Sequence, residues 1–461
     1  MKYKLYANDS RHPAVHRKGL IYITIVAFIL CGILTLNAQT LTLRSQLNFP
    51  GTFHTDVWGY VDPNTGNEYA ILGDASSSSG FAVVDVTDPD NPFQVSSVTS
   101  VPGFDVKVWD HYVYTVNGGG NGMGGIVDIA DPNNPQPVGN FPSSHNIFIS
   151  DDGYLFLESP GIRIYDLNTT PENPSIVWSG GSEGHDATVI GDRFYDFHGI
   201  TGTNIYDIST ISNPQLLVTI QDPTITYHHS GWPTEDGQFL YICDELAHGS
   251  QPDITVWDIS NINNPQKVDQ FVDPNAIVHN LQIVGNYAYV SYYTAGFRVF
   301  DVSQPSQTTL VDEYDTNQSS GESFGGAFGV YALSPSGNIF VNDWDNGLFV
   351  FSFGSPTGTN TNSPSHHQPQ KFLLSQNYPN PFNPSTTIAY QIPSESHVTL
   401  TIYNALGQPI RTLVNEQKSV GGYTINWDGK DNRGRPLGTG FYFYQIKAGE
   451  FTDSKKMLKV E

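Results

Sequence analysis

The sequence predicts an all-β protein: a seven-bladed β-propeller followed by a small β-sandwich. Three observations support this prediction. The chain of 461 residues contains 44 Gly and 30 Pro, and only 14% of it is charged, a composition that disfavours helical bundles and coiled coils. Apolar and polar residues alternate in many short runs, as they do in strands with one buried face. The third observation is a phrase that recurs at nearly constant spacing.

The recurring phrase consists of an apolar run, an Asp, several polar residues that usually include Asn-Pro, and a second apolar run. Clear copies are FAVVDVTDPDNPFQV at 81–95 and DITVWDISNINNPQKV at 253–268, and GLFVFSFG at 347–354 is a shortened copy. Successive copies lie 38 to 51 residues apart, measured between Asp85, Asp128, Asp166, Asp207, Asp258, Asp301 and Ser352. Propeller blades of about four strands have such periods, so seven copies predict seven blades. We interpret the repeated Asp as turn residues that bond their own backbone.

The last copy lacks an outer strand, because it runs into a Ser/Thr/Pro-rich segment at 354–371 that is predicted to be a linker. A spare strand, LTLRSQLNF, lies near the other end of the repeats at 41–49. We expect this strand to pair with 347–353 as the fourth strand of the seventh blade, which would leave no open sheet edge. The propeller is therefore predicted to span 41–353.

Charge is distributed unevenly along the chain. Between residues 39 and 370 there are 6 basic and 37 acidic residues, whereas the remainder up to residue 461 has 10 basic and 7 acidic ones. A segment this acidic repels phosphate backbones, so nucleic-acid binding is excluded. Its charge fits either simple solubility or the attraction of cations such as Ca²⁺. The change near residue 370 marks a domain boundary.

The first 38 residues are interpreted as a secretory signal peptide. Basic residues precede the apolar run at 20–36, and Asn37-Ala38 follow it, which is the layout of such a signal. The run of 17 residues is also at the lower limit for a retained membrane anchor. Cleavage after Ala38 would leave Cys243 as the only cysteine and exclude an intramolecular disulfide. Either way, we expect the protein outside the cell or on its outer surface.

Residues 372–461 are predicted to form a second, antiparallel Ig-like β-sandwich, because VTLTIY, YTINWD and FYFYQIK alternate between turn sequences. The phrase NYPNPFNP at 377–384 resembles the start of type A sorting domains of the type IX secretion system. The resemblance implies that 372–461 contact the type IX secretion machinery. It also implies export across the outer membrane, with release or attachment at its surface. An ordinary Ig-like adhesion domain is the alternative.

Long phrases of the propeller carry a second resemblance. They are YHHSGWPTEDGQFLYICDELAHG at 227–249, VHNLQIVGNYAYVSYYTAGFRVFDV at 278–302 and GNIFVNDWDNGLFVF at 337–351. In these segments the chain resembles the LVIVD-repeat proteins called choice-of-anchor B. This resemblance implies an extracellular propeller joined to a cell-surface anchor, and it implies no particular reaction.

When the seven predicted inner strands are aligned, mostly polar residue pairs stand at equivalent positions near their starts. The inner strands line the channel of a propeller. The pairs are Thr55-Asp56, Phe104-Asp105, His145-Asn146, His185-Asp186, His229-Ser230, His279-Asn280 and Phe328-Gly329. From them we select His145, His185, His229, His279, Asp56, Asp105 and Asp186 as candidate ligand-binding residues. They could converge on a divalent cation, since His suits Zn, Cu or Fe and carboxylates suit Ca or Mn. Alternatively, they form hydrogen bonds that tie neighbouring inner strands together.

The fifth unit contains weaker metal candidates. Asp244 and Glu245 follow a predicted strand and lie near His248, so they could form a metal site, an acid/base pair or an ordinary structured loop. Taken together, the sequence favours an extracellular binding or adhesion module with an unidentified ligand over an enzyme, and a divalent cation is the only cofactor it suggests. The alternative is a metal-dependent hydrolase or lyase with its site at the channel mouth.

Overall fold

The computed structural model describes most of the chain beyond residue 38. The described residues are 39–49, 53–75, 80–319, 321–354, 372–374, 377, 382, 384–418, 421–449 and 451–460. The predicted signal peptide at 1–38, nearly all of the predicted linker and most of the NYPNPFNP phrase lie outside them. Within the described part, no helix has the length and apolar character needed to cross a membrane.

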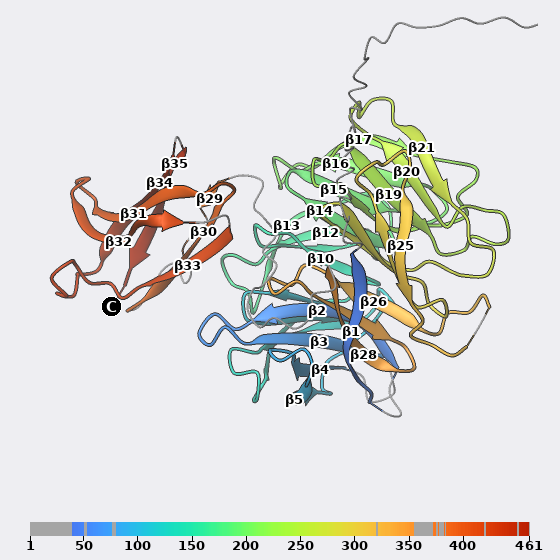
Figure 1. Cartoon of the computed structure of the whole chain (residues 1–461), viewed down its shortest axis with the longest axis horizontal. Coiled ribbons are helices and arrows are strands. Elements are labelled where there is room, and N and C mark those ends of the chain that lie inside the picture. The colour runs from blue at the N-terminus through green and yellow to red at the C-terminus, as the bar shows by residue number, and fades with distance from the viewer. Residues whose placement is uncertain are drawn as a thin grey trace, which may run out of the picture. The chain divides into compact units, whose positions relative to one another are not determined.

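Residues 40–354 form seven antiparallel four-stranded sheets, counted over the described residues, which are the blades of a propeller (Figure 1). The inner strands are β2 (His54–Val61), β6 (Asp105–Trp109), β10 (Ile147–Ile149), β14 (Asp186–Ile190), β18 (His228–Pro233), β22 (Leu281–Val284) and β26 (Ala327–Tyr331). Each inner strand contacts those of the two neighbouring blades, and β26 contacts β2, so the ring is closed around a central channel.

The second and third strands of each blade continue outward from the channel. The second strands are β3 (Glu68–Asp74), β7 (Tyr112–Val116), β11 (Tyr154–Leu157), β15 (Arg193–Phe197), β19 (Phe239–Asp244), β23 (Tyr287–Ser291) and β27 (Asn338–Asp343). The third strands are β4 (Gly80–Asp85), β8 (Met123–Asp128), β12 (Ile162–Asp166), β16 (Thr203–Asp207), β20 (Ile254–Asp258), β24 (Phe297–Asp301) and β28 (Gly347–Gly354). Apolar side chains pack between adjacent blades, as where Ile71 and Val83 of the first blade join Val113 of the second.

The outer strands of blades one to six are β5 (Phe93–Val98), β9 (Gln136–Pro142), β13 (Ser175–Gly180), β17 (Gln215–Ile220), β21 (Gln266–Phe271) and β25 (Thr309–Tyr314). The seventh blade takes its outer strand from the other end of the repeats: β1 (Thr40–Leu47), blue in Figure 1, pairs antiparallel with β28, drawn in orange. Leu41 faces Phe353 in this pairing, and Leu47 faces Leu348. The predicted closure of the ring is confirmed.

The repeated Asp residues end the third strands and form turns, as predicted. In six blades the carboxylate accepts a hydrogen bond from the backbone N–H two residues later, at distances of 2.7 to 2.9 Å. Asp85, for example, accepts from the Thr87 N–H at 2.9 Å. These side chains hold the chain in the conformation that returns it as the outer strand.

The C-terminal residues form a β-sandwich of two sheets. One sheet contains β29 (Leu373–Leu374), β30 (Thr386–Ile392) and β33 (Gly421–Trp427) in that order. The other has the order β32 (Pro409–Lys418), β31 (Ser396–Asn404), β34 (Gly440–Ala448) and β35 (Phe451–Lys459). Trp427 of the first sheet and Tyr444 of the second are fully buried in one apolar cluster, which is the core that the alternating sequences predict.

Candidate functional site

Six ring side chains from six consecutive blades form a closed aromatic belt at one end of the channel. Neighbouring ring centroids are 4.0 to 5.8 Å apart around the belt. Its members are Phe104, His145, His185, His229, His279 and Phe328. Each stands at or just before the start of an inner strand, which explains why a single alignment column contains them all. The first blade instead contributes Thr55, whose hydroxyl donates to the Gly103 carbonyl at 2.9 Å.

Two belt histidines connect the inner strands of neighbouring blades. His229 Nδ1 lies 3.1 Å from the His279 carbonyl oxygen, and His279 Nδ1 lies 2.7 Å from that of Phe328. A carbonyl oxygen accepts only from a protonated nitrogen, so Nδ1 carries the proton and Nε2 keeps its lone pair. His145 differs, because its Nδ1 lies 2.7 Å from Oδ1 of the adjacent Asn146. Such hydrogen bonds hold the imidazoles in the orientation that a metal ligand requires.

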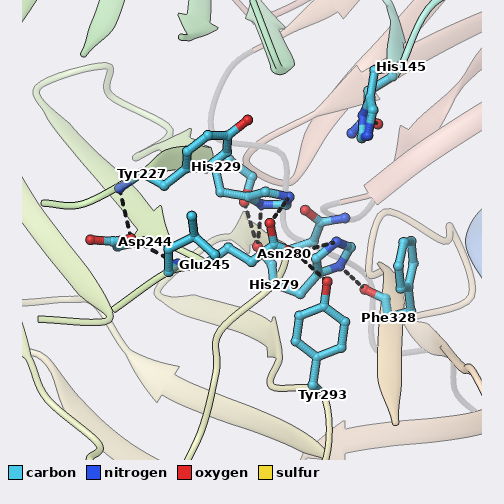
Figure 2. A network of polar contacts seen from close by, with 12 residues as sticks. His145, Tyr227, His229, Asp244, Glu245, His279, Asn280, Tyr293 and Phe328 are labelled. Carbon is cyan, nitrogen blue, oxygen red and sulfur yellow. Dashed lines mark hydrogen bonds and ion pairs between the residues drawn. The ribbon is translucent and has the colours of Figure 1, made fainter. Parts of the chain in front are cut away.

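Glu245, in the loop after β19, brings a carboxylate to the Nε2 side of these rings. Its carboxylate oxygens lie 3.4 Å from His229 Nε2 and 3.9 Å from His279 Nε2. The Tyr293 hydroxyl donates to Glu245 Oε1, and Figure 2 shows it pointing toward the belt. One ligand atom each from His185, His229 and Glu245 lie within 4.8 Å of one another. The lone pair at His229 Nε2 therefore faces a carboxylate in this group, an arrangement that a bound cation would stabilise.

Three of the belt histidines, His185, His229 and His279, are neutral at physiological pH. Burial, together with the positive charge that nearby histidines would carry, lowers the pKa of His229 and of His279 to about 3. The same causes lower the pKa of His185 even further. A weak contact with the His229 backbone raises the pKa of His185 slightly and does not offset these causes. Among the described residues, His185 Nδ1 has no hydrogen-bond partner of regular geometry. Neutral imidazole is the form that coordinates metal ions.

The predicted aspartates form a separate acidic layer, one residue further along the inner strands. Lys107 Nζ lies 2.6 Å from Asp56 Oδ2 and 2.5 Å from Asp105 Oδ1, and Asp105 Oδ2 accepts from the Ile147 N–H at 2.7 Å. Burial and the negative charge of Asp105 raise the pKa of Asp186 to about 7. Belt and acidic layer line the same cavity of about 160 Å³. Among the described residues, however, these aspartates are not part of the group at ligand distance.

The three weaker metal candidates occupy different environments, so the structure does not support them as one site. The Asp244 carboxylate accepts from the backbone N–H groups of Tyr227 and Leu246, both at 3.0 Å, as Figure 2 shows for Tyr227. The His248 side chain is 60% exposed and lies 2.9 Å from Glu322. Only Glu245 belongs to the belt group.

Two further site residues were missed by the sequence analysis. Lys107 is one of only 6 basic residues between 39 and 370, and it stands in the middle of an inner strand, so its rarity is a signal that could have identified it. Tyr293 carries no comparable signal, because it is one of 25 tyrosines and follows a strand already rich in them.

Family models match two parts of this architecture. The LVIVD repeat matches residues 104–142 and 277–316, in the second and sixth blades. The FlgD Ig-like domain matches residues 382–451, in the C-terminal sandwich. The chain therefore combines a β-propeller, two of whose blades match the LVIVD repeat, with a C-terminal sandwich that matches the FlgD Ig-like domain. A search of the curated proteins found no match.

Several solved structures are similar to the chain at low identity. One is PorZ, an essential bacterial surface component of the type IX secretion system of Porphyromonas gingivalis. It is 11% identical with a TM-score of 0.44, and the match covers 86% of this chain but only 58% of PorZ. The WD40 β-propeller domain of Doa1 is 13% identical with a TM-score of 0.47, covering 68% of this chain and 97% of that domain. The designed protein Ika8 is 11% identical with a TM-score of 0.45, covering 67% and 99%.

Proposed function

We propose that this protein is a cell-surface binding module, whose propeller binds a divalent transition-metal cation at the aromatic belt. The observation that carries the proposal is the group formed by His185, His229 and Glu245, whose ligand atoms lie within 4.8 Å of one another. Two imidazoles and a carboxylate favour Zn²⁺ or a similar ion over Ca²⁺, which prefers oxygen ligands alone.

The surroundings of this group favour a cation in two ways. The acidic layer next to the belt contains three aspartates and a single lysine, and the segment from residue 39 to 370 carries 37 acidic residues against 6 basic ones. Such a field concentrates cations at the channel mouth. The lone pair at His229 Nε2 faces the Glu245 carboxylate at 3.4 Å, and a cation between them converts this repulsion into two attractive contacts.

Three protein ligands leave a coordination position for a group from outside the protein. In a binding module this position would hold a carboxylate, imidazole or hydroxyl of an extracellular partner. The same open position is found in hydrolytic zinc sites, which keeps the metal-dependent hydrolase as the second candidate. Hydrolysis that appears only in the zinc-loaded protein would favour the second candidate over the first.

We further propose that the C-terminal domain acts as a type A sorting domain of the type IX secretion system. The NYPNPFNP phrase at its start and the basic and apolar segments at 1–38 support export followed by surface attachment or release. Such export would bring the channel mouth outside the cell, where an extracellular ligand can reach it. Together with the propeller repeats, these features support membership of the choice-of-anchor B group.

Calorimetric titration of the purified, chelator-treated protein with Zn²⁺ tests the metal site. His229→Asn is the most informative variant, because the Asn amide can still donate to the His279 carbonyl while Nε2 is lost. We expect this variant and Glu245→Gln to bind Zn²⁺ at least about 100-fold more weakly than the wild type. His248→Asn, which changes an exposed histidine outside the group, is the matched control and should bind normally. Equal affinity of all four proteins would refute the proposal.

A further inference from the structure

Blade four carries a second group of chemically matched side chains, separate from the aromatic belt. Ser182 Oγ lies 2.8 Å from His198 Nε2, and His198 Nδ1 lies 3.1 Å from Asp196 Oδ2. Ser182 is exposed in the connection between β13 and β14, whereas His198 follows β15 and Asp196 belongs to it. This is the hydrogen-bond order of a serine nucleophile, its general base and the carboxylate that orients the base.

We propose that Ser182, His198 and Asp196 form a nucleophilic site that transfers acyl groups from uncharged carboxylic esters. The acidic propeller surface disfavours anionic esters by repulsion. The activity would be independent of the proposed metal site, since Ser182, His198 and Asp196 are not members of the metal-ligand group.

The orienting carboxylate is itself held in place by neighbouring side chains. Asp196 is fully buried, and its Oδ2 accepts from Asn204 Nδ2 at 2.9 Å. Thr219 donates to Asn204 Oδ1 at 2.7 Å, which fixes the orientation of that amide. His198 therefore receives a carboxylate of fixed position, as a general base requires. The hydrogen bond to Asp196 raises the pKa of His198 above its ordinary value despite partial burial.

A second buried carboxyl group, that of Glu158, lies close to Asp196. Glu158 is fully buried, and neither of its carboxyl oxygens has a hydrogen-bond donor among the described residues. Burial and the negative charge of Asp196 raise the pKa of Glu158 well above its ordinary value, which favours the uncharged form of this carboxyl group beside Asp196. At Gly184, a Cβ atom would lie 2.3 Å from Asp196 Oδ1 and 2.7 Å from Glu158 Oε2, so a glycine is required there.

The local sequence around Ser182 fits the same chemistry. Residues 180–184 read Gly-Gly-Ser-Glu-Gly, which matches the G-x-S-x-G pattern of serine hydrolases, although here it connects two strands instead of a strand and a helix. The Glu183 backbone N–H, directly after the serine, makes no hydrogen bond to the residues that the structure describes. It is available to stabilise the oxyanion of a tetrahedral intermediate.

With this geometry, ester hydrolysis takes place in two steps, acylation of Ser182 and hydrolysis of the acyl-serine. Ser182 Oγ attacks the ester carbonyl carbon while its proton passes to His198 Nε2, and the alcohol leaves with that proton as the acyl–oxygen bond breaks. Water then attacks the acyl-serine, gives a proton to His198, and releases the carboxylic acid as Ser182 recovers its proton.

Covalent labelling of the full-length protein with an alkyl fluorophosphonate, in the presence of EDTA, tests the proposal. We expect one adduct, mapped by mass spectrometry to Ser182, in the wild type and none in Ser182→Ala. Ser209→Ala removes another exposed serine and should be labelled like the wild type. Failure to label Ser182 in folded wild-type protein would overturn the assignment, whatever the outcome of the zinc titration.

Hydrolysis of p-nitrophenyl acetate in EDTA provides the second measurement. Ser182→Ala should reduce the rate about 100-fold or more, since it removes the nucleophile. Asp196→Asn should move the midpoint of the rate–pH profile to lower pH, because His198 loses the carboxylate that raises its pKa. Unchanged hydrolysis in Ser182→Ala, with thermal unfolding equal to that of the wild type, would refute the proposal.

Discussion

Leu41 and Phe353 face each other across the pair of strands that closes the propeller, although they come from opposite ends of its sequence. The Leu41 backbone N–H also donates to Asp312 of the sixth blade at 2.7 Å, and Leu41 and Leu43 pack against the core shared by the last two blades. Strand β1 therefore covers an edge and completes a core at the same time.

Deletion of residues 39–47 should expose the edge of β28 and lower the thermal unfolding temperature. The exposed backbone and apolar side chains should also promote aggregation, which light scattering would detect. Arg44→Ala is the matched control, since it removes only an exposed ion pair with Asp90 and should change stability by less than about 1 kcal/mol. Equal stability of the deletion variant and the wild type would show that closure by β1 is not needed.

Asp186→Asn should increase stability at alkaline pH. Burial raises the pKa of Asp186 to about 7, so the folded wild type keeps a proton that the unfolded chain releases near pH 4. Wild-type stability therefore falls, relative to the variant, as the pH rises from about 4 to 7, by up to about 4 kcal/mol. Denaturant unfolding at pH 5 and pH 8 measures the difference, with Asp192→Asn on an exposed turn as the control. A difference that does not change with pH would contradict the assignment.

Cys243 should be unreactive toward thiol reagents in the native protein. Its side chain is fully buried, and burial raises the pKa of the thiol, so very little reactive thiolate forms. Ellman's reagent should modify it only after addition of guanidinium chloride. Rapid reaction under native conditions would show that the fifth blade opens locally.

Removal of residues 372–461 should leave a folded propeller that does not reach the cell surface. The propeller and the sandwich have separate cores. The isolated propeller should therefore show a β-sheet circular dichroism spectrum and unfold at the same temperature as the propeller within the full-length protein. Surface biotinylation of intact cells measures export. If the truncated protein is labelled as strongly as the full-length one, the C-terminal domain is not the sorting signal.

The architecture could be predicted because it depends on local, repeated signals. Each blade has its own alternating strands and its own Asp turn, and the missing outer strand of the last copy identified β1 as its replacement. The alignment column likewise located the belt, since equivalent positions of a closed ring meet at its axis. Lys107 interrupts the apolar pattern of its strand, yet it was absent from the predicted site.

Which of the candidate residues share one site could not be predicted, because this depends on where their side chains point. No local sequence pattern specifies those directions. Asp244 and Glu245 are adjacent in sequence, yet one binds backbone N–H groups of its own blade and the other faces the channel. The aspartates lie one residue beyond the aligned positions that hold Thr55, Phe104 and His185, and this offset places them in a different layer. Similarly, the Gly-Gly-Ser-Glu-Gly segment is readable in the sequence, but its alignment with His198 is a property of the folded blade.

The pairing of β1 with β28 also limits the order in which the propeller can fold. If the chain crosses a membrane with its N-terminus first, β1 emerges before β28. It then stays unpaired until the whole seventh blade has crossed. A propeller with only some of its blades formed would thus be an incomplete ring with an unpaired sheet edge at each end. During this interval, premature pairing of β1 with the seventh blade of another chain would yield strand-exchanged dimers.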